Sequence, residues 1–341
     1  MIASLSIRPY DPEYDEAPVY ALWQRTLHGT WPLSQAAFHR RTVASGVYQP
    51  ADHLVAQLQD GQLVGFVATQ GWIIPSVPRE QQPRAEVMVV LVDPRHQRNG
   101  IGRELLGRAL AALKDRGLSE VQLGAGARSY FWPGVPADLP HARHFFEACG
   151  WPCDEESFDL VAGLHDFSTP VGVYERVRLP GATVAVATRG DVAAVLAFEA
   201  RHFPQWLPAF EAAARDHAHT DIVVAKDSCG EVVGSVLAVD HRGGDFVWRQ
   251  SLGDDSGGVS VLGVAEDIRG KGVGLALAAR ATELLRARGL AVSYVGYTWL
   301  KDWYGLLGYR VWREYGMSWR ALAMAPPNNR LERTGCAGRS A

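Results

Sequence analysis

Cysteine, long apolar runs and any strong excess of one charge are scarce in this 341-residue sequence. The four cysteines form no CxxC pair, so Cys149 and Cys153 are expected to pack as ordinary side chains in a reducing compartment. No run approaches the ~18 apolar residues of a membrane span, and the first residues hold no apolar signal core. We therefore expect a soluble, cytoplasmic protein.

The sequence also has almost no excess of one charge, because 34 basic and 37 acidic residues leave a net charge of −3. Basic residues are concentrated only in the last few positions, which argues against a nucleic-acid or anionic-membrane partner. Residues 324–341 contain proline, asparagine and arginine but no aromatic residue, and we expect them to be a disordered tail.

The clearest positive signal is a segment that occurs twice, at Val87–Gly102 (VMVVLVDPRHQRNGIG) and Val259–Gly274 (VSVLGVAEDIRGKGVG). Each copy predicts a buried strand, a polar turn and a helix start marked by glycines. The copies lie 172 residues apart, about half the chain. The sequence therefore predicts one module present twice, over residues 1–167 and 182–323, joined by a linker at 168–181.

Both modules show the same order of expected elements. The first has strand Ser4–Pro9, helix Glu13–Leu27, a hairpin over His53–Gln70, strand Val87–Val92, helix Gly102–Arg116, strand Val121–Leu123, helix Arg143–Cys149 and last strand Asp159–Gly163. The second has strand Thr183–Thr188, helix Asp191–His202, a hairpin over Ile222–Val239, strand Val259–Val264, helix Leu275–Arg288, strand Val292–Tyr297, helix Asp302–Leu307 and closing strand Val311–Trp319. The predicted fold class is α/β (α+β), with a mixed, mostly antiparallel sheet flanked by helices in each half.

A strand that leads into a glycine-rich helix start offers unpaired backbone N–H groups to an anion. A Walker loop is excluded because Gly270-Lys271 is followed by Gly272, and the dinucleotide fingerprint is excluded because residues 105 and 277 are leucine. What fits, twice, is Q/R-x-x-G-x-G/A after a central strand.

This pattern resembles the GNAT superfamily of acetyl-CoA-dependent acyltransferases, and the duplication resembles its tandem-domain, mycothiol synthase-like branch. The resemblance implies acetyl-CoA as co-substrate and no metal. It implies that the pyrophosphate is held by Gln97, Arg98, Asn99, Gly100, Ile101 and Gly102 or by Arg269, Gly270, Lys271, Gly272, Val273 and Gly274. It also implies that a bulged central strand binds the pantetheine arm at Val90, Leu91 and Val92 or at Leu262, Gly263 and Val264.

In that family a tyrosine near the end of the last helix often protonates the departing thiolate. Tyr304 has this place in the second half and Phe146 in the first, so the resemblance favours the C-terminal half as catalytic. The more regular glycine turn and the aromatic loop of the first half argue the other way, and both halves being active stays open. The general base is also open: Glu86 stands where some relatives keep one, whereas the second half offers Asp254, Asp255, His241 or Asp302.

The hypothesis is an N-acetyltransferase that acts on the amine of a small molecule by direct attack in a ternary complex. The alternative is a coenzyme A-binding scaffold with one or both halves inactive. The eleven tryptophans either pack the cores and the domain interface or line an acceptor cleft. Residues 124–140 form a Pro/Gly/aromatic loop suited to a lid or binding loop, and the tandem arrangement mildly favours a monomer.

Overall fold

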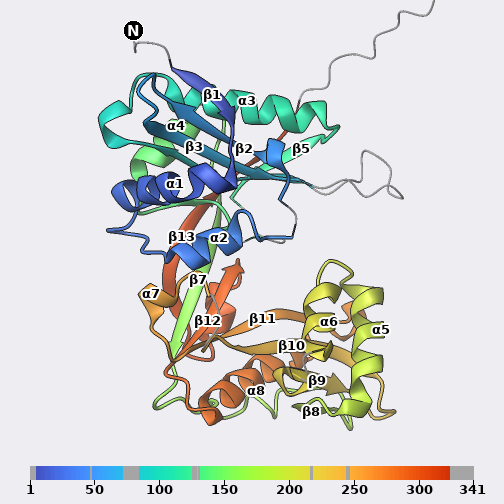
Figure 1. Ribbon diagram of the computed structural model, residues 1–341. Helices are drawn as coiled ribbons and strands as arrows, with labels where there is room; N and C mark the ends of the chain where they lie inside the picture. Colours follow the sequence, from blue (N-terminus) through green and yellow to red (C-terminus); the bar gives the residue numbers. More distant parts are fainter. Residues whose placement is uncertain are drawn as a thin grey trace, which may run out of the picture.

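The computed structural model describes residues 5–46, 48–71, 84–124, 129, 131–215, 218–242 and 246–322, which form two sheets with helices on both faces (Figure 1). Both sheets are mixed and mostly antiparallel, with one parallel pair of strands in each, which confirms the expected fold class. No helix within these ranges is long and apolar enough to cross a bilayer. The tail expected at 324–341 lies outside the described residues.

The first sheet contains the predicted hairpin and first central strand. Its order is β1 (Ser6–Pro9), β2 (His53–Gln57), β3 (Leu63–Gln70), β4 (Ala85–Val92), β5 (Glu120–Leu123) and β14 (Trp319–Ala321). One face is covered by α1 (Pro12–Thr26) and α2 (Gln35–Arg41), the other by α3 (Ile101–Asp115) and α4 (Pro140–Ala148). Helix α3 carries an apolar stripe at helical spacing, which is why one side of it is buried.

The second sheet is larger. Its order is β6 (Val135–Pro136), β13 (Arg310–Met317), β7 (Glu155–Gly163), β12 (Val292–Thr298), β11 (Ser256–Val264), β10 (Val232–Asp240), β9 (Ile222–Lys226) and β8 (Thr183–Val186). Helices α5 (Val192–His202) and α6 (Leu207–Arg215) pack near β8–β10, and α8 (Val273–Ala287) packs on β10 and β11. Two short helices, α7 (Arg249–Leu252) and α9 (Lys301–Gly305), complete the described elements.

The two halves exchange their last strands. Strand β7 lies between β12 and β13 in the second sheet, and β14 pairs with β5 in the first (Figure 1). The expectation that Asp159–Gly163 closes the first sheet was therefore wrong. The expected strand Val311–Trp319 does lie in the second sheet as far as Met317, but from Trp319 on the chain pairs with the first. Alternation along a strand shows which face is buried but not which strand is its neighbour. The predicted module limits, 1–167 and 182–323, stay a prediction.

Tryptophans join the halves. Trp132 stacks on Trp23 at 5.5 Å between ring centroids and on Trp248 at 6.1 Å, and Trp31 lies 4.7 Å from Trp248. All four are buried, which confirms the packing interpretation for these residues. Trp72 lies outside the described residues.

The aromatic loop predicted at 124–140 is part of this interface where the structure describes it. Phe131 and Trp132 are buried between the halves, and β6 pairs with β13. The interpretation of this part as a lid was therefore wrong, because an aromatic-rich loop can equally be packed in a core.

The linker runs along α8 rather than through solvent. Val177 and Leu179 pack against the core beneath it, and the Tyr174 hydroxyl donates to Glu283 at 2.9 Å. At the start of the helix, the Arg178 N–H donates to the Lys271 carbonyl at 2.8 Å. As a result α8 is buried over more of its circumference than α3.

Candidate active site

Both glycine turns have the same backbone geometry. Gly100 and Gly272 are the N-caps of α3 and α8, with φ of 85° and 83°, in the left-handed region that side chains disfavour. The first intrahelical bonds come from the N–H groups of Glu104 and Ala276. The N–H groups of the three residues before Glu104, and of the three before Ala276, therefore have no acceptor within the helix. An anion site at a helix start requires such unpaired N–H groups.

The first residue of each motif shapes its turn. The Gln97 side-chain amide donates to the Val92 carbonyl at 3.1 Å, and the Arg269 guanidinium donates to the Val264 carbonyl at 3.2 Å. These are equivalent bonds at equivalent positions. They explain why a long side chain with an N–H donor stands at the start of both motifs, and they make its role the support of the loop.

The last glycine of each motif makes room for an aromatic ring. A Cβ added at Gly102 would lie 3.3 Å from Phe145, and one added at Gly274 would lie 3.4 Å from Trp303. Phe145 and Trp303 come directly before Phe146 and Tyr304, the two residues at the position of the family's acid. The helices α4 and α9 therefore contact the glycine turns.

The two turns differ in what covers them. A Cβ added at Gly100 would meet nothing within 4 Å, whereas one added at Gly272 would lie 2.8 Å from the carbonyl carbon of Arg176 and 3.1 Å from the amide nitrogen of Val177. Residues 97–100 are exposed, and Lys271 and Gly272 are half-buried. The first turn is open to a ligand, and the second has the linker backbone against it.

The central strands separate from their parallel neighbours at equivalent points. Strand β4 pairs with β5 only over Ala85–Val87, and β11 pairs with β12 only over Ser256–Gly258. Each central strand continues beyond this split toward its glycine turn, so backbone groups on that side have no ladder partner in the described sheets. A split of this kind can receive an extended ligand arm.

Bulges in the central strands lie near these splits, earlier than predicted in β4 and overlapping the prediction at Leu262 in β11. In β4 the register shifts at Met88, before Val90–Val92. In β11 it shifts at Val261 and Leu262, and Val261 has a φ of 49°. Gly263 is paired with Ser235 and is no part of the shift. Because Gly263 has no Cβ, the Phe203 ring can lie against it. Two ring carbons would be 2.7 and 2.9 Å from an added Cβ.

Glu86 lies beside the split of the first half. Its side chain is buried, accepts a hydrogen bond from the Gln70 amide and faces Gln122, its register partner on β5. The Gln70 amide also donates to the Ser129 carbonyl at 3.3 Å. Sequence reasoning missed Gln70 and Gln122, because alternation within a strand does not show which residues of the neighbouring strands lie beside Glu86.

The equivalent position of the second half, Gly258, has no side chain, but His241, one of the candidate bases, lies beside it. Its ring is 3.1 Å from where a Cβ would be and is stacked on Phe246. Burial lowers the pKa of His241 to about 4. Asp254 is exposed and pairs with Arg249 at 2.6 Å. The residue at position 86 thus carries a carboxylate in the first half, whereas the equivalent Gly258 has a neutral imidazole against it.

Tyr304 lies on α9 in the core of the second half, with 6% of its surface exposed. Its ring packs edge-on against Trp303 at 4.8 Å and Tyr309 at 5.6 Å. Burial raises the pKa of its hydroxyl, so the group holds its proton. Phe146 is partly buried against the first core.

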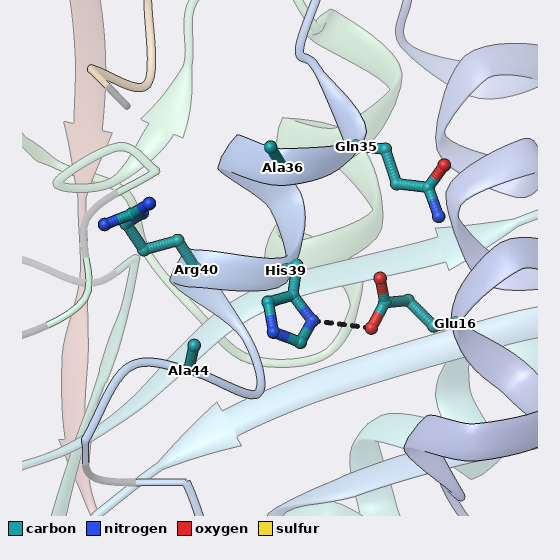
Figure 2. A pocket seen from close by; sticks show the side chains of 6 residues that line it. All are labelled: Glu16, Gln35, Ala36, His39, Arg40 and Ala44. Carbon is teal, nitrogen blue, oxygen red and sulfur yellow. Dashed lines mark hydrogen bonds and ion pairs between the residues drawn. The ribbon is translucent and has the colours of Figure 1, made fainter. Parts of the chain in front are cut away.

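A surface pocket lies between α1 and α2 (Figure 2). Glu16 of α1 and His39 of α2 point toward each other there, with Nδ1 of the imidazole 2.6 Å from a carboxylate oxygen. Helix α2 ends at Arg41, whose carbonyl accepts from the Ser129 hydroxyl. The pocket and the Glu86 cluster are thus connected through one helix end.

Within the described ranges, no three His, Cys, Asp or Glu side chains gather as metal ligands.

The model of the acetyltransferase (GNAT) family matches residues 16–151 and 193–301, more than half of the chain. This chain belongs to the acetyltransferase (GNAT) family. The family resemblance seen in the sequence is confirmed, and members of the family use acetyl-CoA.

Curated relatives named mycothiol acetyltransferase are similar over part of their length. The relative from Clavibacter sepedonicus is 30% identical over 202 residues, 59% of this chain and 60% of the relative. The relative from Beutenbergia cavernae is 29% identical over 260 residues, 70% of this chain and 72% of the relative. The match to the relative from Thermobispora bispora, at 33% identity, spans 39% of its length. The chain thus covers less than two thirds of some of these relatives.

Solved structures show the tandem arrangement. A fungal multi-domain GH3 β-N-acetylglucosaminidase, described as containing a glucosamine N-acetyltransferase region, matches with a TM-score of 0.81 and 29% identity, over 93% of this chain and 38% of that one. A tandem GNAT protein from the clavulanic acid biosynthesis pathway matches with a TM-score of 0.59 and 16% identity, over 95% of this chain and 100% of that one. The second likeness concerns the fold alone.

Proposed function

We propose that this chain transfers the acetyl group of acetyl-CoA to the amine of a small molecule, and that it does so in the first half. The proposal rests on one observation. The first half has both an open glycine turn, at Gly100, and a buried carboxylate on the same central strand, at Glu86. The second half has neither, because Arg176 lies against its turn and residue 258 is glycine.

The residues of the first turn fit the diphosphate of coenzyme A. The space beside Gly100 is open, the amides of Ile101, Gly102 and Arg103 face out of the helix start, and Gln97 supports the loop. Residues 88–92 of β4, past the split, offer backbone groups to the pantetheine arm and the carbonyl. Acetyl-CoA itself supplies an activated thioester.

An amine attacks only after it has lost its proton. Glu86 is the acidic side chain at the split, and Gln70 fixes the orientation of its carboxylate. We therefore assign Glu86 the role of general base, acting on the ammonium group directly or through one water. No side chain of α4 can protonate the leaving thiolate from position 146, which is phenylalanine, so that proton comes from water.

The acceptor follows from the chemistry of the relatives. One solved neighbour is described as a glucosamine N-acetyltransferase region, and the curated relatives are named for mycothiol. We propose a small polar amine of the amino-sugar type, and glucosamine is the first substrate to test. A monomeric state and a cytoplasmic location stay predictions.

Transfer in the second half is the other candidate, as the sequence suggested. Tyr304 favours it, because a protonated hydroxyl stands where the family keeps its acid. In this case Leu262, Val264, Arg269, Gly270 and Lys271 border the coenzyme, and the linker at Arg176 must leave space for it.

Gly100→Glu tests the choice of half. The new carboxylate stands at the helix start, where it repels a diphosphate, so coenzyme A binding by calorimetry is expected to weaken at least ~100-fold. Gly107→Glu is the matched control, because residue 107 lies on the exposed side of the same helix with open space around it.

Three outcomes are informative. If Gly100→Glu loses coenzyme A binding and glucosamine acetylation while Gly107→Glu keeps both, the result supports transfer in the first half. Full activity in Gly100→Glu, with a loss of at least tenfold in Tyr304→Phe, moves the reaction to the second half. Coenzyme A binding without turnover of any amine in a panel supports the scaffold alternative.

A further inference from the structure

Tyr297 of the second half reaches into the site of the first. It belongs to β12, three residues beyond Tyr294, the last residue that pairs with the central strand β11. Its hydroxyl lies 3.4 Å from the side-chain amide of Gln122 on β5. Gln122 is the register partner of Glu86, so this contact brings a residue of the second sheet to the split of the first.

The backbone of Tyr297 is held in a strained conformation. Its φ is 54°, in the left-handed region that a bulky residue rarely adopts. Its N–H donates to one carboxylate oxygen of Asp159 at 2.9 Å. The other oxygen accepts from the hydroxyls of Tyr294 and Tyr315, at 2.7 Å each. Strain of this kind persists only where the surroundings impose it, and it gathers at functional sites.

The proton of the Tyr297 hydroxyl is not used by Gln122. The amide nitrogen of Gln122 is the donor, with one of its hydrogens directed at the Pro133 carbonyl at 3.0 Å and the other at the tyrosine oxygen. Burial and the nearby Glu86 raise the pKa of Tyr297, so its hydroxyl stays protonated at neutral pH. The side chain is only partly buried, which leaves it within reach of a bound molecule.

We propose that Tyr297 is a specificity residue of the first-half site, where its hydroxyl donates a hydrogen bond to an oxygen of the acceptor next to the reacting amine. This inference rests on the proposed function. The acceptor class that follows is an amine with a neighbouring hydroxyl or ether oxygen, which amino sugars and amino alcohols provide. A donor positioned to meet such an oxygen favours an amine that carries it over one that does not.

The test compares two amines in Tyr297→Phe. With glucosamine, KM is expected to rise about tenfold, the usual effect of losing one hydrogen bond, while kcat and the KM for acetyl-CoA change less than ~2-fold. With cyclohexylamine, which has no oxygen, wild type and variant are expected to have equal kcat/KM. Calorimetry of glucosamine binding without acetyl-CoA is expected to show the same tenfold weakening.

Tyr315→Phe is the matched control. It removes a hydroxyl from the same carboxylate, Asp159, at the oxygen that the Tyr297 N–H does not bond, so it is expected to lower the unfolding temperature without changing the ratio of the two amines. Equal losses for both amines in Tyr297→Phe, or no loss for either, would overturn the inference. Absence of acetyl transfer to any amine by the wild type would overturn the proposed function as well, so the two failures are distinguishable.

Discussion

Helices α3 and α8 begin with the same glycine turn, yet one faces solvent and the other lies under the linker. In α3 six residues are buried on one stripe, from Ile101 to Leu113. In α8 nine are buried, from Val273 to Leu285, because the linker covers a second side. A duplicated module can thus keep its local geometry while its surroundings decide which copy is open to a ligand.

The difference extends to the splits. The first half has a buried carboxylate, Glu86, where the second has Gly258 under the ring of His241. The second half has a tyrosine at 304 where the first has phenylalanine at 146. The chemical groups of one complete site are therefore divided between the halves, and the predictions below test which set is used.

Glu86→Gln should have the largest effect. The amide keeps the size of the side chain and can still bond Gln70, but it cannot take a proton, so kcat for glucosamine should fall by ~10²–10⁴-fold. Circular dichroism checks that the fold is kept. A loss below ~3-fold would mean that deprotonation occurs elsewhere, in the second half or in bulk water.

Alanine at the two N-cap glycines should separate the open turn from the covered one. Gly100→Ala adds only the cost of a left-handed alanine, about 1 kcal/mol of unfolding free energy. Gly272→Ala adds the same cost plus the clash with the Arg176 backbone, together about 2–4 kcal/mol. Urea denaturation measures both, and equal losses would show that the linker is not packed on the second turn.

Glu199→Gln should have a smaller effect that depends on pH. Glu199 of α5 is fully buried, and its carboxylate accepts a hydrogen bond from the Ser235 hydroxyl. Burial raises the pKa of Glu199 to about 7 from an ordinary 4.5, although its hydroxyl neighbour Ser235 opposes the shift. The folded state therefore favours the protonated acid. The stability that this contributes is complete below about pH 4.5 and is lost as pH rises through about 7.

The glutamine variant is neutral at every pH. Its free energy of unfolding should therefore be about 2–3 kcal/mol higher than that of wild type at pH 8 and nearly the same as that of wild type at pH 4. Urea denaturation at the two pH values measures this. Equal differences at both would show that the Glu199 carboxyl is not responsible.

Local features were predictable from the sequence. The strand–turn–helix segments, both hairpins and the helix before Gly150 follow from periodicity and glycine placement, which act within a few residues. The glycine turns were found for the same reason, but the bonds of Gln97 and Arg269 to the Val92 and Val264 carbonyls were not predicted, since the motif was interpreted only as a diphosphate site.

Features set by distant residues were not predictable. Nothing in the strand 155–163 shows that its neighbours are β12 and β13, and nothing near Tyr297 shows that its hydroxyl meets Gln122. The cover on α8 did leave a signal. Its sequence VGLALAARATELLRA is apolar on more sides than one sheet can bury, whereas that of α3 carries charges on its outer side.

The exchange of last strands has a consequence for synthesis on the ribosome. The amino-terminal sheet is completed by residues 319–321, so it gains its final edge strand only after almost the entire chain has been made. Until then β5 presents an unpaired edge, and contacts that span some two hundred residues must form late. Each sheet therefore contains a strand from the other half, and neither sheet is complete before both halves have been synthesised.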